Sequence, residues 1–137
     1  NINFVTSKVI KEAVNTLNNK DNILTLGNIS VIRDWGWAEE YVEAMQLILR
    51  SDDLKNHIIC TGNKNSLESF VSKVFKKIGL NYRDHIRIDK KLSRKFENQS
   101  IYGDPKLLKQ DLGWEPKKKF EDIIDLLLED ELQNREN

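Results

Sequence analysis

At 137 residues the chain is the size of one domain and is long enough to bury a modest core. Its 22 basic side chains (Lys and Arg) balance its 22 acidic ones (Asp and Glu), which argues against a general nucleic-acid-binding surface. No apolar run approaches the roughly 18 residues of a membrane span, and no signal peptide is visible. We therefore expect neither a nucleic-acid partner nor a membrane partner.

The chain has one cysteine, Cys60, in the apolar run Ile58-Ile59-Cys60. A single cysteine cannot form an internal disulfide, so a reducing, cytoplasmic location and a buried apolar role for Cys60 are expected. The sequence opens at Asn1 without a methionine, which suggests a fragment or a processed product.

Apolar residues at helical spacing predict a first helix near the N-terminus, which the polar run 18–22 ends. Thr6 or Asn3 is a candidate N-cap. The apolar face of this helix consists of Val9, Ile10, Ala13, Val14 and Leu17.

Two short strands are predicted next, over residues 23–26 and 29–32. The second leads into the corner Arg33-Asp34-Trp35-Gly36-Trp37, where a glycine permits a tight turn. An amphipathic helix then runs from about Ala38 to near Arg50.

Residues 56–61 are predicted to form a buried strand, because Ile58, Ile59 and Cys60 are contiguous rather than alternating. We expect this strand to belong to a nucleotide-binding sheet, and the chain on its own to expose apolar surface. A helix capped by Ser66 and stopped by Gly79 follows.

The C-terminal half predicts a strand over residues 86–88 and a basic loop over residues 92–100. Asp104-Pro105 is typical of a cap followed by a proline in the first turn, so a short helix is expected up to Gly113. Trp114 is expected to anchor the last two helices. The final helix begins near Phe120, and residues 134–137 are expected to fray. Helices alternating with short strands indicate the α/β class.

Several catalytic and cofactor motifs are missing. The six glycines never approach the Gly-x-Gly-x-x-Gly spacing of a dinucleotide loop, and neither histidine has neighbours at metal-ligand spacing. Tyr102 and Lys106 have the Tyr-x-x-x-Lys spacing of short-chain dehydrogenases. Gly103 and Pro105 lie between them, so we do not expect one helix face to present both side chains.

Arg33 is the most distinctive polar residue, because its planar guanidinium is always ionised and suits phosphate or carboxylate. A local ion pair with Asp or Glu is the alternative explanation for it.

The chain carries a series of short motifs in a characteristic order. Arg33-Asp34-Trp35-Gly36 is followed by Tyr41-Val42-Glu43-Ala44-Met45. The others are Asn3-Phe4-Val5-Thr6, Leu26-Gly27-Asn28, Thr61-Gly62, Gly103-Asp104-Pro105 and Leu112-Gly113-Trp114-Glu115-Pro116. On these motifs, which cover nearly the whole chain, the sequence resembles the C-terminal part of GDP-mannose 4,6-dehydratases, which are extended short-chain dehydrogenase/reductase enzymes.

The resemblance implies an α/β fold that is the C-terminal part of an NAD(P)-binding Rossmann-type enzyme. Residues 1–137 would form the substrate-binding portion, with the N-terminal Rossmann part absent. The catalytic groups and the glycine loop of the family lie in that N-terminal part, so no catalytic, cofactor-binding or metal-binding residue is expected here.

The resemblance also implies seven substrate-binding residues. Arg33 aligns with a family arginine that contacts the diphosphate of the sugar nucleotide. Arg94 and Glu97 match the family's Arg-Pro-x-Glu, in which the arginine reaches the diphosphate and the glutamate faces hydroxyls of the nucleotide. The remaining residues match the wall beside the guanine: Lys8, and the backbone around Val5, Leu26 and Asn28. Lys95 replaces the usual proline, Lys90-Lys91 makes the preceding run more basic, and Trp37 stands where histidine is common.

For the whole enzyme the resemblance implies NADP-dependent conversion of GDP-mannose to GDP-4-keto-6-deoxymannose plus water, within GDP-fucose biosynthesis. The implied partners are GDP-mannose or a related nucleotide sugar, and further copies of the chain in a dimer or tetramer. Two alternatives remain open: an epimerase or dehydratase acting on another nucleotide sugar, and a non-catalytic, truncated nucleotide-sugar-binding module.

Overall fold

The computed structural model describes residues 4–53, 55–93 and 99–136, with side chains up to residue 135. Helices alternate with short strands, so the α/β class is confirmed. In chain order, with η for a 3₁₀ helix, the elements are α1 (Val5–Asn18), β1 (Leu24–Leu26), β2 (Ile32–Arg33), α2 (Ala38–Leu49), β3 (Asn65–Ser66), α3 (Leu67–Lys77), η1 (Tyr82–Asp84), β4 (Ile86–Ile88), η2 (Lys90–Leu92), β5 (Ser100–Ile101), α4 (Lys106–Leu112) and α5 (Phe120–Glu136).

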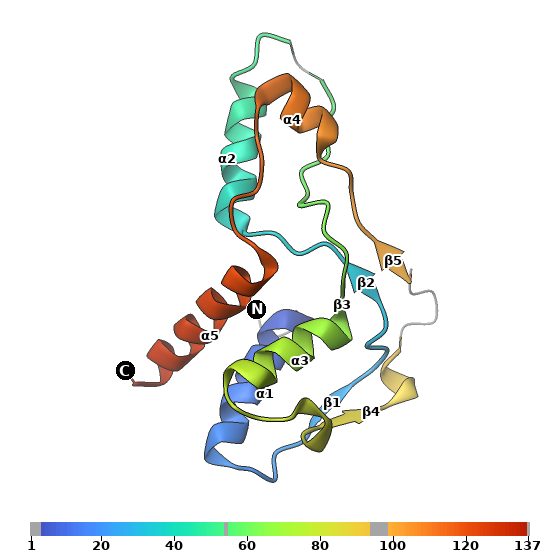
Figure 1. Cartoon of the computed structure of the whole chain (residues 1–137), viewed down its shortest axis with the longest axis vertical. Coiled ribbons are helices and arrows are strands. Elements are labelled where there is room, and N and C mark those ends of the chain that lie inside the picture. Colours follow the sequence, from blue (N-terminus) through green and yellow to red (C-terminus); the bar gives the residue numbers. More distant parts are fainter. Residues whose placement is uncertain (1–3, 54, 94–98, 137) are drawn as a thin grey trace.

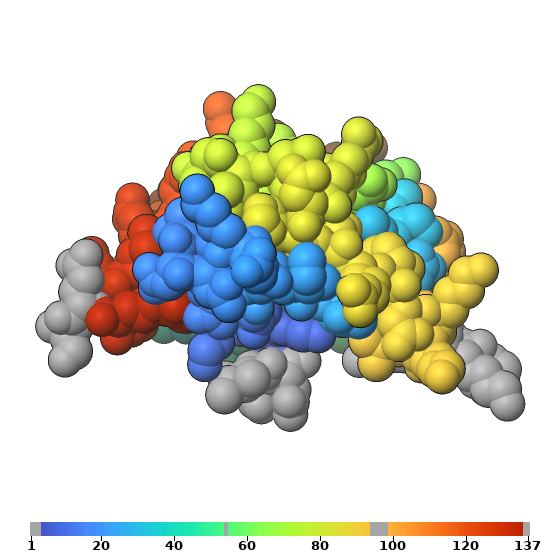
Figure 2. All heavy atoms as spheres, turned by 90° about the horizontal axis from the view of Figure 1, so that it is seen from below, coloured from blue at the N-terminus to red at the C-terminus, as the bar shows by residue number. Residues whose placement is uncertain are grey.

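The molecule is elongated, with helices at both ends (Figure 1). At one end α1, α3 and α5 gather beside the parallel pair of strands β1 and β4, and at the other end α2 lies beside α4. Figure 2 looks onto the first end and shows α3 seated over α1, with α5 to one side and β4 to the other. None of the helices in the described part of the chain combines the length and apolar character needed to cross a membrane.

The main core forms where α1, α3 and α5 pack on one another and on β1. As predicted, the hydroxyl of Ser66 caps α3 by accepting a hydrogen bond from the N–H of Ser69 at 3.0 Å. Gly79 follows the helix with φ at +76°, a conformation that glycine adopts without strain. Fully buried residues of this core include Val9, Ala13, Leu24, Phe70, Val71, Val74, Phe75 and Ile124.

Both sheets are formed by very short strands. β2 is the middle strand of the second sheet and pairs antiparallel with β3 and parallel with β5. Only Ile32 of the predicted strand 29–32 takes part. The reason is that the carbonyls of Ile29 and Val31 instead accept hydrogen bonds from the N–H groups of Glu68 and Leu67, at the start of α3.

A second, smaller core joins α2 to α4 and consists of Ala44, Leu108 and Trp114. Trp114 is buried, as predicted, but the prediction that it anchors the last two helices is wrong. Its ring meets Tyr41 of α2 edge-on at 6.2 Å between centroids, and no residue of α5 belongs to this cluster. The prediction placed the indole between the helices next to it in the sequence. In the structure it packs against a helix about seventy residues earlier.

The predicted buried strand at residues 56–61 is wrong. These residues form no strand, because the described chain offers them no ladder partner. Cys60 is buried as expected, but Ile58 is 62% exposed and Ile59 only half-buried. Of this apolar run only Ile58 is largely exposed, while Ile59 packs against the second core.

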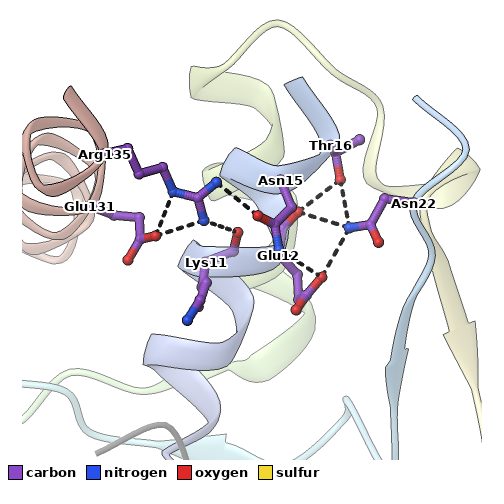
Figure 3. A network of polar contacts seen from close by, with 7 residues as sticks. All are labelled: Lys11, Glu12, Asn15, Thr16, Asn22, Glu131 and Arg135. Carbon is purple, nitrogen blue, oxygen red and sulfur yellow. Dashed lines mark hydrogen bonds and ion pairs between the residues drawn. The ribbon is translucent and has the colours of Figure 1, made fainter. Parts of the chain in front are cut away.

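The prediction that residues 134–137 fray is wrong for residues 134–136, because α5 continues to Glu136, and residue 137 lies outside the described residues. Arg135 holds this end of the helix against α1 (Figure 3). Its Nη1 donates to Oδ1 of Asn15 at 2.7 Å, its Nη2 to the carbonyl of Lys11 at 3.2 Å, and its Nε to Glu131 at 2.7 Å. These charge-assisted bonds oppose the tendency of a chain end to unwind.

Smaller differences concern the ends of elements. Of the two predicted caps of α1, Thr6 lies inside the helix, whose N-cap is Phe4 without a side-chain bond. Asn3, the other candidate, lies outside the described residues. Within the predicted loop 92–100, Leu92 belongs to η2 and Ser100 to β5, and residues 94–98 lie outside the description. Pro105 is the N-cap of α4 rather than its first residue, while Gly113 ends that helix with φ at +68°, as expected.

The outer face of α2 carries exposed apolar side chains, which leads to a testable prediction. Val42, Met45 and Leu49 recur at helical spacing and are 51%, 50% and 78% exposed, which is unusual for three neighbouring apolar side chains. We expect the purified chain to self-associate and to bind a dye specific for apolar surfaces. The double substitution Met45→Lys and Leu49→Lys should weaken both effects in sedimentation velocity and dye titration.

The control is Leu17→Lys, which changes an exposed apolar residue on α1 and should leave association unchanged. A chain that is strictly monomeric, melts in one sharp transition and binds no dye would contradict this interpretation of the α2 face.

Candidate functional site

The corner between β2 and α2 is held from several sides. The backbone of Arg33 pairs with Asn65 of β3 and with Ile101 of β5, and its Nη1 donates to the carbonyl of Ile32 at 2.7 Å. Two residues further on, the indole of Trp35 lies 5.5 Å from the ring of Phe70 and stacks at 5.6 Å on Phe120. The arginine therefore projects from backbone that is fixed by both strand pairing and aromatic packing.

Asp34 links this corner to residues 61 and 62. Its Oδ1 accepts hydrogen bonds from the backbone N–H of Thr61 at 3.0 Å and from the Thr61 hydroxyl at 2.6 Å. Its Oδ2 accepts from the N–H of Gly62 at 2.8 Å. Both carboxylate oxygens are thus occupied within the protein.

Gly36 has a steric reason to be glycine. A Cβ at this position would come within 2.4 Å of ring atoms of Tyr41 in the first turn of α2. A larger residue would displace the tyrosine and with it the entry angle of the helix.

A pocket of about 240 Å³ opens beside the corner, between the start of α1, the end of β1 and the start of α3. Four predicted site residues line it together: Val5, Leu26, Asn28 and Arg33. Its other lining residues are Gly27, Val31, Trp35, Leu67 and Leu92. The structure therefore brings together residues far apart in the sequence around a mainly apolar hollow that Arg33 also lines.

These additional lining residues are not among the predicted site residues. Trp35 could have been found from its place in the same motif as Arg33. Gly27 also had a recognisable role, since a Cβ there would lie 2.9 Å from backbone atoms of Leu92. Leu67 and Leu92 carried no signal, because apolar residues at helical or 3₁₀ positions are ordinarily core residues.

Lys8 does not line the pocket. Its Nζ donates to the backbone carbonyl of Thr25 at 2.8 Å, so this lysine ties α1 to β1. Arg94 and Glu97 lie outside the described residues.

The other side of the corner faces a second hollow of about 340 Å³, and Arg33 lines this one too. Burial and, secondarily, the charge of Asp34 raise the pKa of the Tyr41 hydroxyl to about 12. The same two causes raise the pKa of the Cys60 thiol, which therefore stays protonated and is a poor nucleophile at neutral pH.

Tyr102 and Lys106 do not form a catalytic helical pair, as predicted. Tyr102 follows β5 in irregular backbone and Lys106 is the first residue of α4. The Tyr102 ring instead receives the ammonium of Lys64, 3.8 Å from its centroid. Across the described ranges no group of three or more His, Cys, Asp or Glu side chains is placed to hold a metal ion.

Comparison with known proteins gives a consistent family. The family model described as GDP-mannose 4,6 dehydratase matches residues 1–127. GDP-mannose 4,6 dehydratase 1 of Arabidopsis thaliana is 35% identical over 131 residues, which cover 96% of this chain and 36% of that protein. The chain thus spans little more than a third of the length of this relative.

Solved structures agree on the fold. RMD from Pseudomonas aeruginosa, complexed with NADPH, aligns with a TM-score of 0.85 at 18% identity, over 98% of this chain and 44% of that one. The dTDP-glucose 4,6-dehydratase of Bacillus anthracis, in complex with NAD, aligns with a TM-score of 0.83 at 17% identity, over 98% of this chain and 41% of that one. The expected fold of an extended short-chain dehydrogenase/reductase is confirmed.

The raised pKa of Tyr41 predicts a pH-dependent stability. The ordinary tyrosine pKa is about 10, so the folded protein holds this proton more tightly than the unfolded chain does. The resulting stabilisation is complete below about pH 10 and is lost as the pH rises towards about 12. Tyr41→Phe removes this proton and its pH dependence.

Urea unfolding at several pH values between about 9 and 12 checks this, with the tyrosinate absorbance of both proteins recorded in parallel. The free energy of unfolding of the unaltered chain should fall more steeply with pH than that of Tyr41→Phe. Equal slopes would show that Tyr41 titrates as it does in the unfolded chain.

Proposed function

Because this chain belongs to the GDP-mannose 4,6-dehydratase family, we propose that it is the substrate-binding portion of an enzyme that converts GDP-mannose to GDP-4-keto-6-deoxymannose and water. Residues 1–137 would hold and orient the nucleotide sugar rather than transfer protons or hydride. The observation that carries this proposal is the pocket beside Arg33, which is lined by four of the residues that the resemblance assigned to the nucleotide.

The size of the pocket supports the proposal that it holds only part of the ligand. At about 240 Å³ it is smaller than the roughly 300–1,000 Å³ typical of sites that enclose a whole ligand. We therefore assign the apolar hollow to the flat base, and its charged edge to the diphosphate. Arg33 would give two parallel hydrogen bonds to diphosphate oxygens, a geometry that a guanidinium provides and an ammonium does not.

The wall residues would act mainly through their backbone and shape. The carboxamide of Asn28 is already engaged, since its Oδ1 accepts from the N–H and the hydroxyl of Ser30 at 3.0 and 2.7 Å. That leaves the backbone of Asn28 to face a base. Val5 and Leu26 supply apolar surface, while Lys8 holds α1 in place through Thr25. Arg94 and Glu97 complete the proposed set at the diphosphate and the nucleotide hydroxyls.

A nicotinamide cofactor is part of the proposal for the whole enzyme, because related enzymes of this fold hold NADPH or NAD. We favour NADP on the family resemblance. The cofactor would supply and take back the hydride. The residues of this chain do not fit a site for it: there is no Gly-x-Gly-x-x-Gly loop, and Tyr102 and Lys106 are not on one helix. No step of the reaction is therefore assigned to a residue of this chain.

We further propose a cytoplasmic dimer or tetramer as the working state. The exposed apolar face of α2 supports association, and the single cysteine suits a reducing compartment. A second candidate function is the dehydration of another nucleotide sugar, which is favoured by the structural similarity to the dTDP-glucose enzyme. Titration with GDP-mannose and dTDP-glucose side by side separates the two.

The role of Arg33 and Arg94 is testable by substitution. A charge-assisted hydrogen bond contributes roughly 1.5–3 kcal/mol, so changing either arginine to alanine should weaken GDP binding by about tenfold to a hundredfold. Arg→Lys should restore part of the loss, and Arg33 should show the larger effect because its backbone is fixed. Calorimetric titration with GDP and with guanosine measures this.

The matched control is Arg50→Ala, an exposed arginine at the C-cap of α2 that lines neither hollow of the corner. It should leave both affinities unchanged. If Arg33→Ala weakens GDP and guanosine equally, the arginine does not bind the diphosphate, and if it affects neither, the proposed site is wrong.

A second test concerns catalysis. The purified chain with GDP-mannose and NADP should form no 4-keto product, because binding of the sugar alone cannot start a reaction that needs a bound hydride carrier. The assay follows the 4-keto sugar over time. Turnover that persists after any longer contaminating enzyme has been removed would contradict the assignment of this chain to binding alone.

A further inference from the structure

Asp34 occupies an unusual place for a carboxylate next to a phosphate-binding arginine. It accepts three hydrogen bonds, from the N–H and hydroxyl of Thr61 and from the N–H of Gly62, at 3.0, 2.6 and 2.8 Å. With both oxygens engaged inside the protein, the side chain has a structural anchor about thirty residues further along the chain. It is one peptide unit away from Arg33 and cannot move without moving it.

The segment that Asp34 binds is itself restrained. Gly62 has φ at +77°, a region that other residues enter only with strain, and a Cβ there would lie 3.0 Å from Pro105. The Thr61 hydroxyl also accepts from the N–H of Asn63 at 3.1 Å. Two residues later Asn65 pairs with Arg33 in the sheet. The loop is thus connected to the corner twice: through the hydrogen bonds of Asp34, and through the pairing of Asn65 with Arg33.

The remaining support of the corner does not replace this bond set. Trp35 packs on Phe70 and Phe120 and fixes the chain after Asp34. Such ring contacts determine how deeply the side chain is buried more than how the backbone is rotated. Strand pairing of Arg33 involves only two residues on each strand. The carboxylate is the directional contact that determines which way the backbone of the corner faces.

We propose that Asp34 is a positioning residue for the nucleotide diphosphate, acting through Arg33 by holding the corner against Thr61 and Gly62. It does not touch the ligand. The inference rests on the proposed function, because it presupposes that Arg33 binds the diphosphate. It extends that function by making the affinity for GDP depend on a carboxylate that would otherwise seem unfavourable beside an anion.

Asp34→Asn is the direct test. The amide places an N–H₂ donor where a carboxylate oxygen accepted, opposite a backbone N–H, so at least one of the three bonds is lost. We expect GDP affinity to fall about tenfold, since a small misplacement of a binding group is costly, and guanosine affinity to change less than about twofold. Thr61→Val removes the hydroxyl that donates to Asp34 and accepts from the N–H of Asn63, but keeps both backbone donors to Asp34. It should therefore give a smaller loss with the same selectivity for GDP.

Thr61→Val also keeps the inference testable if Asp34→Asn folds poorly, because it preserves the shape of the side chain. A carboxylate elsewhere serves as the control: Glu40 is buried and accepts from the N–H groups of Lys117 and Lys118 at 3.3 and 3.1 Å. Glu40→Gln should lower the melting temperature while leaving the ratio of GDP to guanosine affinity unchanged.

The decisive measurement is a double-mutant cycle for GDP binding by calorimetry. If Asp34 acts through Arg33, Asp34→Asn should have no further effect on GDP affinity in the Arg33→Ala background. Additive losses would overturn the inference while leaving the proposed function standing. An Arg33→Ala chain that binds GDP normally would overturn the proposed function, and with it this inference.

Discussion

The hydrogen bonds between Asp34 and the Thr61–Gly62 turn are the contacts on which the candidate site depends most. They close the corner between β2 and α2 onto a loop that follows it by 27 to 28 residues in the sequence. Because the flanking strands are only two or three residues long, ladder hydrogen bonds alone would hold the corner weakly. The carboxylate of Asp34, with its three hydrogen-bond donors, fixes the orientation of the corner, which such short strands do not.

Apolar packing then places the corner relative to the rest of the molecule. Trp35 reaches into the main core through Phe70 and Phe120, while Tyr41 reaches the smaller core through Trp114. The corner therefore sits between two clusters, with one hollow on each side of Arg33. Such a position suits a binding group that must be held still while its surroundings exclude water.

The sequence predicted those features that local rules decide. Helix periodicity, the Ser66 cap and the glycine stops at 79 and 113 were all recovered, because each depends on residues within a few positions. Apart from the first residues of α1 and α4, the errors arose where contacts between distant residues decide the structure. Residues 56–61 have strand composition but no partner, the carbonyls of Ile29 and Val31 serve α3, and Arg135 keeps the last turn of α5 helical. In the site, the resemblance found four pocket residues, but no local pattern could show that Leu67 and Leu92 close the same pocket or that Lys8 is bound to Thr25.

The central claim is that the pocket beside Arg33 receives a nucleotide diphosphate. The most direct measurement is an NMR titration of the isotopically labelled chain with GDP, following backbone amides and the Nε–H signals of arginine. The account predicts saturable shifts at Leu26, Gly27 and Asn28 together with the Nε–H of Arg33, since these groups border one pocket. A separate hollow is lined by several lysines, among them Lys64, Lys73 and those at 117–119. Shifts confined to that hollow, with the Arg33 signal unmoved, would contradict the account.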